Sequence, residues 1–206
     1  MLKNRDRKIV DCLNQFRCMT RDQVAAIFFN DVKKPITSVN FVLKRLRKRG
    51  YIEVDSSKQP YIYFSKENII KKSSQKVPHY LAIVDFFIDA CKYEKPTIFE
   101  VEHRYGKGFM QPDIFMIWRK RAFFVEIQKS RYSSRLMKNK LSRYINYLKS
   151  EKWLCKTSPY QILEFPFVWI ISKSAYTISD SIIKESLNII QTPTVEAFFA
   201  IERCTT

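Results

Sequence analysis

Apolar residues in the first part of the chain recur at intervals of three and four, the spacing of one helix face. The pattern predicts one helix that ends near residues 17–19, a second over residues 20–29, and a third that starts at Pro35 and stops at Gly50. Residues 51–64 then alternate apolar and polar side chains around a polar turn, which is typical of a β-hairpin. The predicted order is therefore helix, helix, helix, hairpin.

The rest of the chain mixes helical and strand patterns. Around a central pair of strands, the predicted elements are an apolar helix over 78–93, a strand over 97–105, a helix over 132–150, a strand over 164–172, a helix over 180–190 and a last strand over 195–202. With the central pair included, the order is α-β-β-β-α-β-α-β. This mixed order predicts one α/β sheet domain after the helical part.

The central pair consists of two short apolar runs, Ile114–Trp118 and Ala122–Val125, joined by the basic residues Arg119-Lys120-Arg121. Branched and aromatic side chains dominate both runs, so they predict a β-hairpin with a three-residue turn. Asp113 precedes the first strand and Glu126 follows the second, and antiparallel pairing brings these positions to the same end of the sheet. Two carboxylates at one strand end suit a hard divalent cation such as Mg²⁺.

The sequence Pro-Asp, a hairpin, and then Glu-x-Gln-Lys resembles the PD-(D/E)XK nuclease superfamily. The resemblance implies that the carboxylates hold magnesium and that a lysine orients water or stabilises developing charge. This chain has Gln128 at the lysine position, and Lys129 points to the opposite face of the strand. In the enzyme interpretation the candidate site comprises the carboxylates Asp113 and Glu126, one of Glu100 and Glu102 as a further metal ligand, Gln128 to orient water, and Lys140 as a lysine supplied by the next helix. The alternative is that Asp113 and Glu126 simply flank strands.

The order helix, helix, helix, hairpin is typical of a winged helix-turn-helix, in which the third helix enters the major groove of DNA. The outward face of that helix and its flanks carry side chains suited to base edges, thymine methyls and phosphates. These candidate DNA-binding residues are Thr37, Ser38, Asn40, Phe41, Lys44, Arg45, Arg47 and Lys48. A solvated basic face is the alternative, but residues 1–77 hold 18 Lys and Arg against 7 Asp and Glu. This one-sided charge favours DNA recognition.

Composition narrows the function classes. The chain has 206 residues and a formal net charge of +17, which predicts a polyanionic partner, with nucleic acid ahead of an anionic membrane surface. Five scattered cysteines and two histidines argue against a disulfide framework and a zinc ribbon, and three glycines leave no phosphate-binding loop. No run predicts a membrane span and the start lacks the pattern of a signal peptide, so we expect a cytoplasmic protein and no membrane partner.

Taken together, these features resemble the replication-relaxation family of plasmids and other mobile elements. The residues that carry the resemblance are His79 with the helix that follows it, Glu100 and Glu102, Pro112-Asp113, Glu126-Ile127-Gln128, Lys140 and Tyr144. The resemblance implies an α+β protein with an N-terminal winged helix-turn-helix over 1–66, a linker over 67–77, and an α/β domain with PD-(D/E)XK nuclease-like topology over 78–206.

Three functions are compatible with these predictions. The favoured one is a sequence-specific double-stranded DNA-binding protein that acts in plasmid or mobile-element replication, relaxation or conjugative transfer. The second is a magnesium-dependent DNA endonuclease that uses the second domain, and the third is a transcriptional repressor. Besides DNA, the expected partners are a replication or transfer protein and, as a homodimer, a second copy of the chain. Magnesium is required as a cofactor in the endonuclease interpretation.

Overall fold

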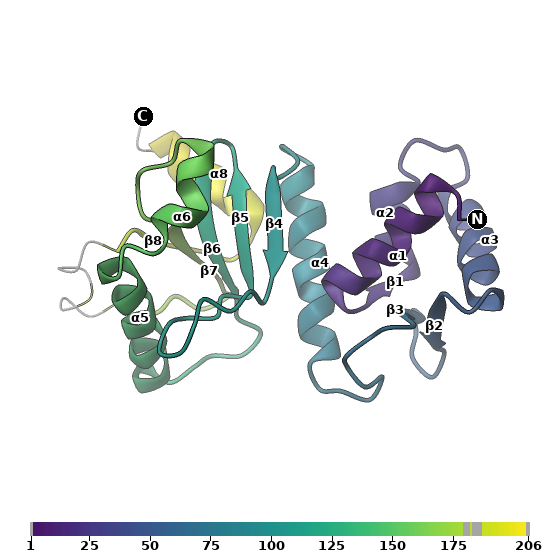
Figure 1. The fold of residues 1–206 in the computed structure, drawn as a ribbon, viewed down its shortest axis with the longest axis horizontal. Helices are drawn as coiled ribbons and strands as arrows, with labels where there is room; N and C mark the ends of the chain where they lie inside the picture. Colours follow the sequence, from purple (N-terminus) through teal and green to yellow (C-terminus); the bar gives the residue numbers. More distant parts are fainter. Residues whose placement is uncertain (1, 179–181, 183–186, 205–206) are drawn as a thin grey trace. The chain divides into compact units, whose positions relative to one another are not determined.

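A computed structural model describes residues 2–178, 182 and 187–204, and it confirms the predicted α+β class. The chain divides into two compact units, residues 1–88 and 89–206, each of which contains helices and a β-sheet of its own (Figure 1). Within the described residues, no helix combines the length and the apolar character needed to cross a membrane.

The first unit contains a small antiparallel sheet and a set of helices. Its elements are α1 (Asn4–Phe16), β1 (Met19–Thr20), α2 (Arg21–Phe28), α3 (Pro35–Lys48), β2 (Ile52–Asp55), β3 (Ile62–Ser65) and most of α4 (Val77–Cys91). The strands lie in the order β1-β3-β2. Both predicted strands of the hairpin are present, and β1 is a short addition that the sequence pattern did not predict.

The helix boundaries in this unit follow from local chemistry. Thr20 caps α2, because its hydroxyl accepts a hydrogen bond from the Gln23 backbone N–H at 3.2 Å and the Gln23 side chain accepts one from the Thr20 N–H at 2.9 Å. Pro35 is at the start of α3, where its missing N–H costs nothing. Gly50 follows α3 with a φ of 73°, a conformation that glycine adopts without strain. The predicted cap and boundaries are confirmed.

Helix α4 packs with the elements that precede it. The Gln23 side-chain amide donates to the Leu81 carbonyl at 2.9 Å and to the Asp85 carboxylate at 2.6 Å, and the Phe16 and Phe87 rings lie 5.3 Å apart. The sequence predicted that the second domain begins at residue 78, whereas the structure groups residues up to Ile88 with the first unit. The apolar pattern of α4 showed that it is buried, but not against which partner.

The second unit is built on a five-stranded sheet. Its elements are β4 (Ile98–Val101), β5 (Ile114–Trp118), β6 (Arg121–Ile127), α5 (Ser134–Lys149), α6 (Leu154–Thr157), the 3-10 helix η1 (Ser158–Tyr160), β7 (Phe167–Ile171), β8 (Ile189–Thr192) and α8 (Val195–Cys204). The strand order is β4-β5-β6-β7-β8, antiparallel from β4 to β6 and parallel from β6 to β8.

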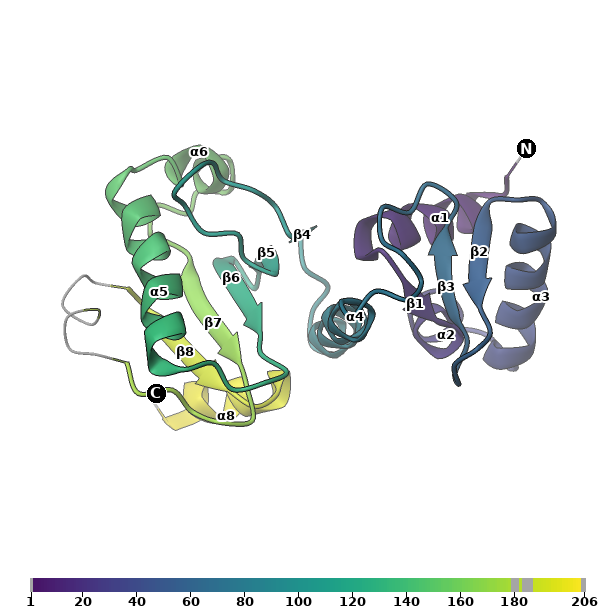
Figure 2. The ribbon, with the colours of Figure 1, turned by 90° about the horizontal axis from the view of Figure 1, so that it is seen from below.

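Helices cover both faces of this sheet (Figure 2). On one face Phe124 packs against Tyr144 of α5, with ring centroids 5.6 Å apart. On the other face Phe198 of α8 packs against Trp169 and Phe123, with centroids 4.7 and 6.0 Å away. Because neighbouring residues of a strand point to opposite faces, Phe123 and Phe124 contact different helices. The sheet therefore has an apolar core on each of its two faces.

The turn of the central hairpin is shorter than predicted. Trp118 pairs directly with Arg121, so Arg121 belongs to β6 and the turn contains Arg119 and Lys120 alone. These two residues have φ values of 50° and 59°, as in a type I′ turn, whose twist matches that of the flanking strands. The prediction of a three-residue turn was wrong because neither residue is the Gly, Asn or Asp that usually marks this turn type.

The predictions near the C-terminus also need correction. Residues 195–202, predicted as a strand, belong to α8, and the last strand is instead β8. Most of the helix predicted over 180–190 lies outside the described residues, but Ile189 and Ile190 at its end are in β8. Apolar residues are nearly continuous over 195–201, so their spacing fits either structure.

Candidate functional site

The outward face of α3 is exposed as the sequence predicted. Val39, Leu43 and Leu46 are buried at 1% exposure or less, so they direct the opposite face to solvent. Six of the eight candidate DNA-binding residues are exposed: Thr37, Asn40, Phe41, Lys44, Arg47 and Lys48. Phe41 is 69% exposed, and Ser38 is half-buried at the edge of the face. An apolar ring, an amide and three cations therefore share one accessible helix face.

Arg45 has a different environment from its neighbours. Its guanidinium donates to both carboxylate oxygens of Asp6, at 2.7 and 2.8 Å, and Asp6 is 2% exposed. A buried carboxylate requires such a partner, because leaving it unpaired is costly. Arg45 therefore connects α3 to α1 within the fold. The sequence placed it at the edge of the DNA-binding face because a helix pattern does not show that Asp6 lies opposite.

In the second unit, the hairpin brings Asp113 and Glu126 together at one end of the sheet. Ile114 pairs with Val125, so the next pair outward is Asp113 beside Glu126. The Ile127 backbone N–H donates to Asp113 Oδ2 at 2.7 Å, which fixes the Asp113 side chain. Glu126 is 1% exposed and lies on the sheet face that α5 covers.

Two side chains from α5 reach the Glu126 carboxylate. The Tyr144 hydroxyl donates to Oε1 at 2.5 Å, and Lys140 Nζ forms an ion pair with Oε2 at 2.5 Å. The predicted inward reach of Lys140 is thus present in the structure. Tyr144 was noted for its family resemblance without a role, and its position one helical turn after Lys140 is the sequence signal that both contact the same group. Each oxygen of Glu126 has one partner from α5.

The electrostatics of this cluster are set by burial. Burial raises the pKa of Glu126 from 4.5 to about 7, and the charge of Asp113 adds to the increase, while Lys140 acts in the opposite direction. Burial lowers the pKa of Lys140, but Glu126 and Asp113 raise it more, so the net pKa is raised. Burial and the Glu126 carboxylate hold the pKa of Tyr144 well above its usual value. At neutral pH Lys140 is therefore cationic and Tyr144 is a hydrogen-bond donor.

The other predicted site residues lie apart from this cluster or contribute through their backbone. Glu100 binds Lys156, with its carboxylate oxygens 3.1 and 3.2 Å from Nζ. Glu102 donates its backbone N–H to the Asp113 carbonyl at 2.9 Å, and half-buried Gln128 donates its own to the Ile171 carbonyl at 2.9 Å. Among the residues that the structure describes, no three His, Cys, Asp or Glu side chains are grouped closely enough to hold a metal ion.

These observations bear on whether the residues fit magnesium. A hard divalent cation requires several oxygen ligands, and the protein usually supplies them from carboxylates. Here the Lys140 ammonium is the cation next to Glu126 Oε2, and Tyr144 occupies Oε1. In this arrangement the cluster does not fit a divalent ion, because a metal would have to displace Lys140.

Comparison with known proteins gives one family. A family model described as replication-relaxation matches residues 11–158, which extend from within α1 through α6 and include Asp113, Glu126 and Lys140. The comparisons with curated proteins and with solved structures returned no match.

Proposed function

The chain belongs to the replication-relaxation family, and we propose that it binds double-stranded DNA in a sequence-specific manner through a winged helix-turn-helix in its first unit. Family membership indicates a role in the replication or relaxation of plasmids or other mobile elements. Within that role, the proposed task of the first unit is to recognise a DNA site, such as a replication or transfer origin. In this proposal the second unit has a PD-(D/E)XK nuclease-like fold, but the function does not require it to cleave DNA.

The observation that carries this proposal is the outward face of α3. Asn40 and Phe41 are exposed side by side, and Phe41 at 69% exposure is the kind of apolar side chain that marks a contact surface. An asparagine amide pairs with adenine in the major groove, and an aromatic ring contacts the thymine methyl. Lys44, Arg47 and Lys48 continue along the helix and supply phosphate contacts.

The element order of the first unit supports the same proposal. The chain runs α1-β1-α2-α3-β2-β3, so α3 directly follows α2 and precedes a hairpin. The residues between β2 and β3, including Lys58, are exposed, as expected of a wing that contacts the sugar-phosphate backbone. Helix α3 and this loop together form the proposed interface.

The test begins with selection of bound sites from random-sequence duplexes, followed by affinity measurements on the selected site and on a scrambled duplex. Asn40→Ala should weaken binding to the selected site by roughly 1–3 kcal/mol and leave the scrambled duplex unaffected. Lys44→Ala and Arg47→Ala should weaken binding to both and reduce the salt dependence by about one phosphate contact each. Lys8→Ala, an exposed lysine of α1, is the matched control and should change neither.

A magnesium-dependent endonuclease is the second candidate, because Asp113, Glu126 and Lys140 share one cluster. Lys140 and Tyr144 already contact both oxygens of Glu126, which favours a binding protein over a metal-dependent enzyme. Any cleavage should therefore be weak. The assay uses magnesium or manganese with supercoiled, linear and branched DNA, beside Asp113→Ala, Glu126→Ala and Lys140→Ala. Robust cleavage that all three changes abolish would establish the endonuclease. Absence of cleavage with unchanged duplex affinity in the variants would support a binding role.

A further inference from the structure

The positive charge of the second unit is concentrated on one segment, which consists of helix α5 and the loop before it. Residues 127–150 contain seven Lys and Arg residues and no Asp or Glu. Over all of residues 89–206 the sequence has 19 Lys and Arg against 12 Asp and Glu, an excess that is also seven. The charge of this one segment therefore equals the whole positive excess of the second unit.

Helix α5 covers one face of the sheet, and its outer side faces solvent (Figure 2). Met137, Leu141 and Tyr144 form the buried side and are at most 4% exposed. Four exposed cations of the segment form no ion pair and no side-chain hydrogen bond within the described residues: Arg131, Arg135, Lys138 and Arg143. In that part of the chain, no acidic side chain neutralises them.

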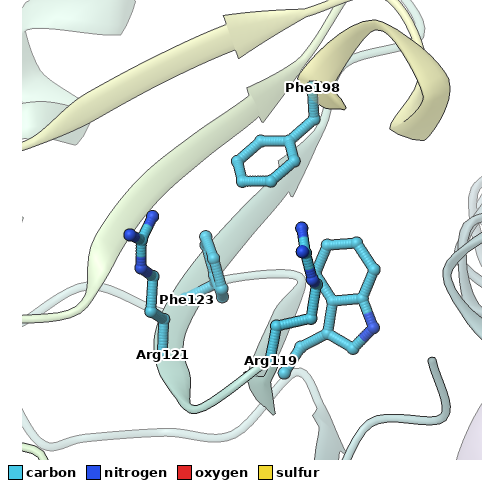
Figure 3. Close-up of a pocket in the computed structure, with 5 residues that line it drawn as sticks. Arg119, Arg121, Phe123 and Phe198 are labelled. Atoms are coloured by element: carbon cyan, nitrogen blue, oxygen red, sulfur yellow. The ribbon is translucent and has the colours of Figure 1, made fainter. Parts of the chain in front are cut away.

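The other basic group of this unit, at the turn of the β5–β6 hairpin, has a different environment. Figure 3 shows Arg119 and Arg121 there among aromatic side chains. Arg119 lies over the Phe199 ring, with its Cζ 4.9 Å from the centroid, and Arg121 lies over Phe167 at 5.8 Å. These two arginines have aromatic partners within the unit, whereas the four exposed cations of the α5 segment have no such partner among the described residues.

Like charges that are close together on a helix destabilise it slightly. Arg135 and Lys138 are three residues apart, as are Lys140 and Arg143, and this spacing brings side chains together on a helix surface. Acidic residues three or four positions away would offset the repulsion, but the segment has none. A polyanionic partner supplies the missing negative charge, so the surface suits such a partner.

Two apolar side chains are exposed among these cations. Leu136 is 56% exposed and Tyr132 is 37% exposed. The Lys140 ammonium lies over the Tyr132 ring, 5.6 Å from its centroid, and Leu136 precedes Lys140 by one helical turn. Proteins hold single strands with such a combination, because cations follow the phosphates while an aromatic ring stacks on a base.

From these observations we propose that the second unit binds single-stranded DNA through an α5 surface, which consists of Arg131, Tyr132, Arg135, Leu136, Lys138 and Arg143. A duplex presents only base edges in its grooves, whereas the bases of a single strand can stack on an exposed ring. Family membership is the reason for choosing DNA over RNA. This activity goes beyond the proposed recognition of duplex DNA by α3, and it does not depend on it.

The test measures fluorescence anisotropy of a labelled oligothymidylate of about 20 nucleotides that binds to the full chain at several salt concentrations. Arg135→Gln and Arg143→Gln should each reduce the slope of log K against log salt by about 0.7, the loss of one phosphate contact. At about 0.1 M salt this corresponds to roughly fivefold weaker binding for each variant. Binding to a duplex of the same length should not change in either variant.

Lys120→Gln is the matched control, because it removes one exposed charge from the same unit at the hairpin turn, outside the α5 surface. It should leave the affinity for the single strand unchanged. The same loss in Lys120→Gln as in the α5 variants would indicate a general effect of net charge and would overturn the proposal.

Tyr132 tests the stacking contact. Tyr132→Ala should weaken binding to the oligothymidylate by about tenfold, whereas Tyr132→Phe keeps the ring and should bind as the wild type does. Thermal unfolding by circular dichroism checks that each variant is folded. Unchanged affinity in Tyr132→Ala, or equal losses on duplex and single strand in the arginine variants, would contradict single-strand binding by this surface.

Discussion

At the scale of single residues, Glu126 is unusual because charged side chains are seldom buried so completely. It is a carboxylate at 1% exposure, and its stabilising partners are Lys140 and Tyr144. A buried ion pair gains little net stability, because removing both charges from water costs about as much as their attraction returns. The cluster is therefore weak evidence for a net stabilising role of these charges.

The raised pKa of Glu126 predicts how stability depends on pH. The folded protein holds the Glu126 proton up to about pH 7, whereas the unfolded chain releases it near 4.5. Stability from this group is thus fully present below pH 4.5 and is lost as the pH rises to about 7. The loss should be of the order of 3 kcal/mol in the free energy of unfolding.

Urea denaturation between pH 4.5 and 7.5 checks this expectation. Tryptophan fluorescence reports on the second unit alone, since Trp118, Trp153 and Trp169 all belong to it. Glu126→Gln should remove this component of the pH dependence, whereas Glu164→Gln, at an exposed position, should keep it. A constant difference between wild type and Glu126→Gln at every pH would contradict the raised pKa.

Arg45 and Arg47 should respond differently to substitution although they are two residues apart on α3. Arg45→Ala leaves the buried Asp6 carboxylate without its partner and should cost roughly 2 kcal/mol of stability. Arg47→Ala, at an exposed position, should change stability by less than about 0.5 kcal/mol. Thermal unfolding by circular dichroism measures both. Equal stability of the two variants would show that the contact between Arg45 and Asp6 does not stabilise the fold.

At the scale of elements, α8 shows how a helix can have the composition of a strand. Its aromatic residues Phe198 and Phe199 pack on Trp118, with centroids 5.9 and 5.8 Å away. Val195 and Phe198 are buried and Glu196 is exposed, which is a spacing of three and not of two. The helix therefore covers one face of the sheet with large apolar side chains.

Substitutions along α8 test this assignment. Phe198→Ala removes a ring that contacts Trp169 and Phe123, and it should cost about 3–5 kcal/mol of stability and shift the tryptophan emission. Glu196→Ala should have little effect, because Glu196 is exposed. In a strand, residues 196 and 198 would share one face and respond alike. Similar losses at both positions would therefore favour a strand.

The elements that the sequence predicted well are those with a local chemical signal. Thr20 with Gln23 marks the start of α2, and Pro35 and Gly50 bound α3. The predictions failed where distant contacts decide the outcome, as for the Asp6 partner of Arg45. The carboxylate site was predicted in part, since strand pairing brings Asp113 to Glu126 but nothing local places Glu100 beside Lys156.

At the scale of the whole molecule, the assignment of α4 decides what an independent first unit contains. The sequence placed a linker over 67–77 and began the second domain with this helix. In the structure Gln23, buried at 7% exposure, donates two hydrogen bonds to α4, and the Cys18 sulfur lies 3.9 Å from the Val77 carbonyl oxygen. Without α4, the Gln23 amide would lose both partners and apolar surface such as Phe16 would be exposed.

Fragments of the chain distinguish the two assignments. A fragment of residues 1–91 should unfold cooperatively and bind duplex DNA with the salt dependence of the whole chain. A fragment of residues 1–76, which keeps the predicted linker and lacks α4, should be less stable by about 2 kcal/mol, which for a unit of this size lowers the melting temperature by roughly 10 °C. The linker is common to both fragments, so the difference isolates the helix. If the shorter fragment melts at the same temperature as the longer one, α4 does not stabilise the first unit, and the boundary predicted from the sequence is the correct one.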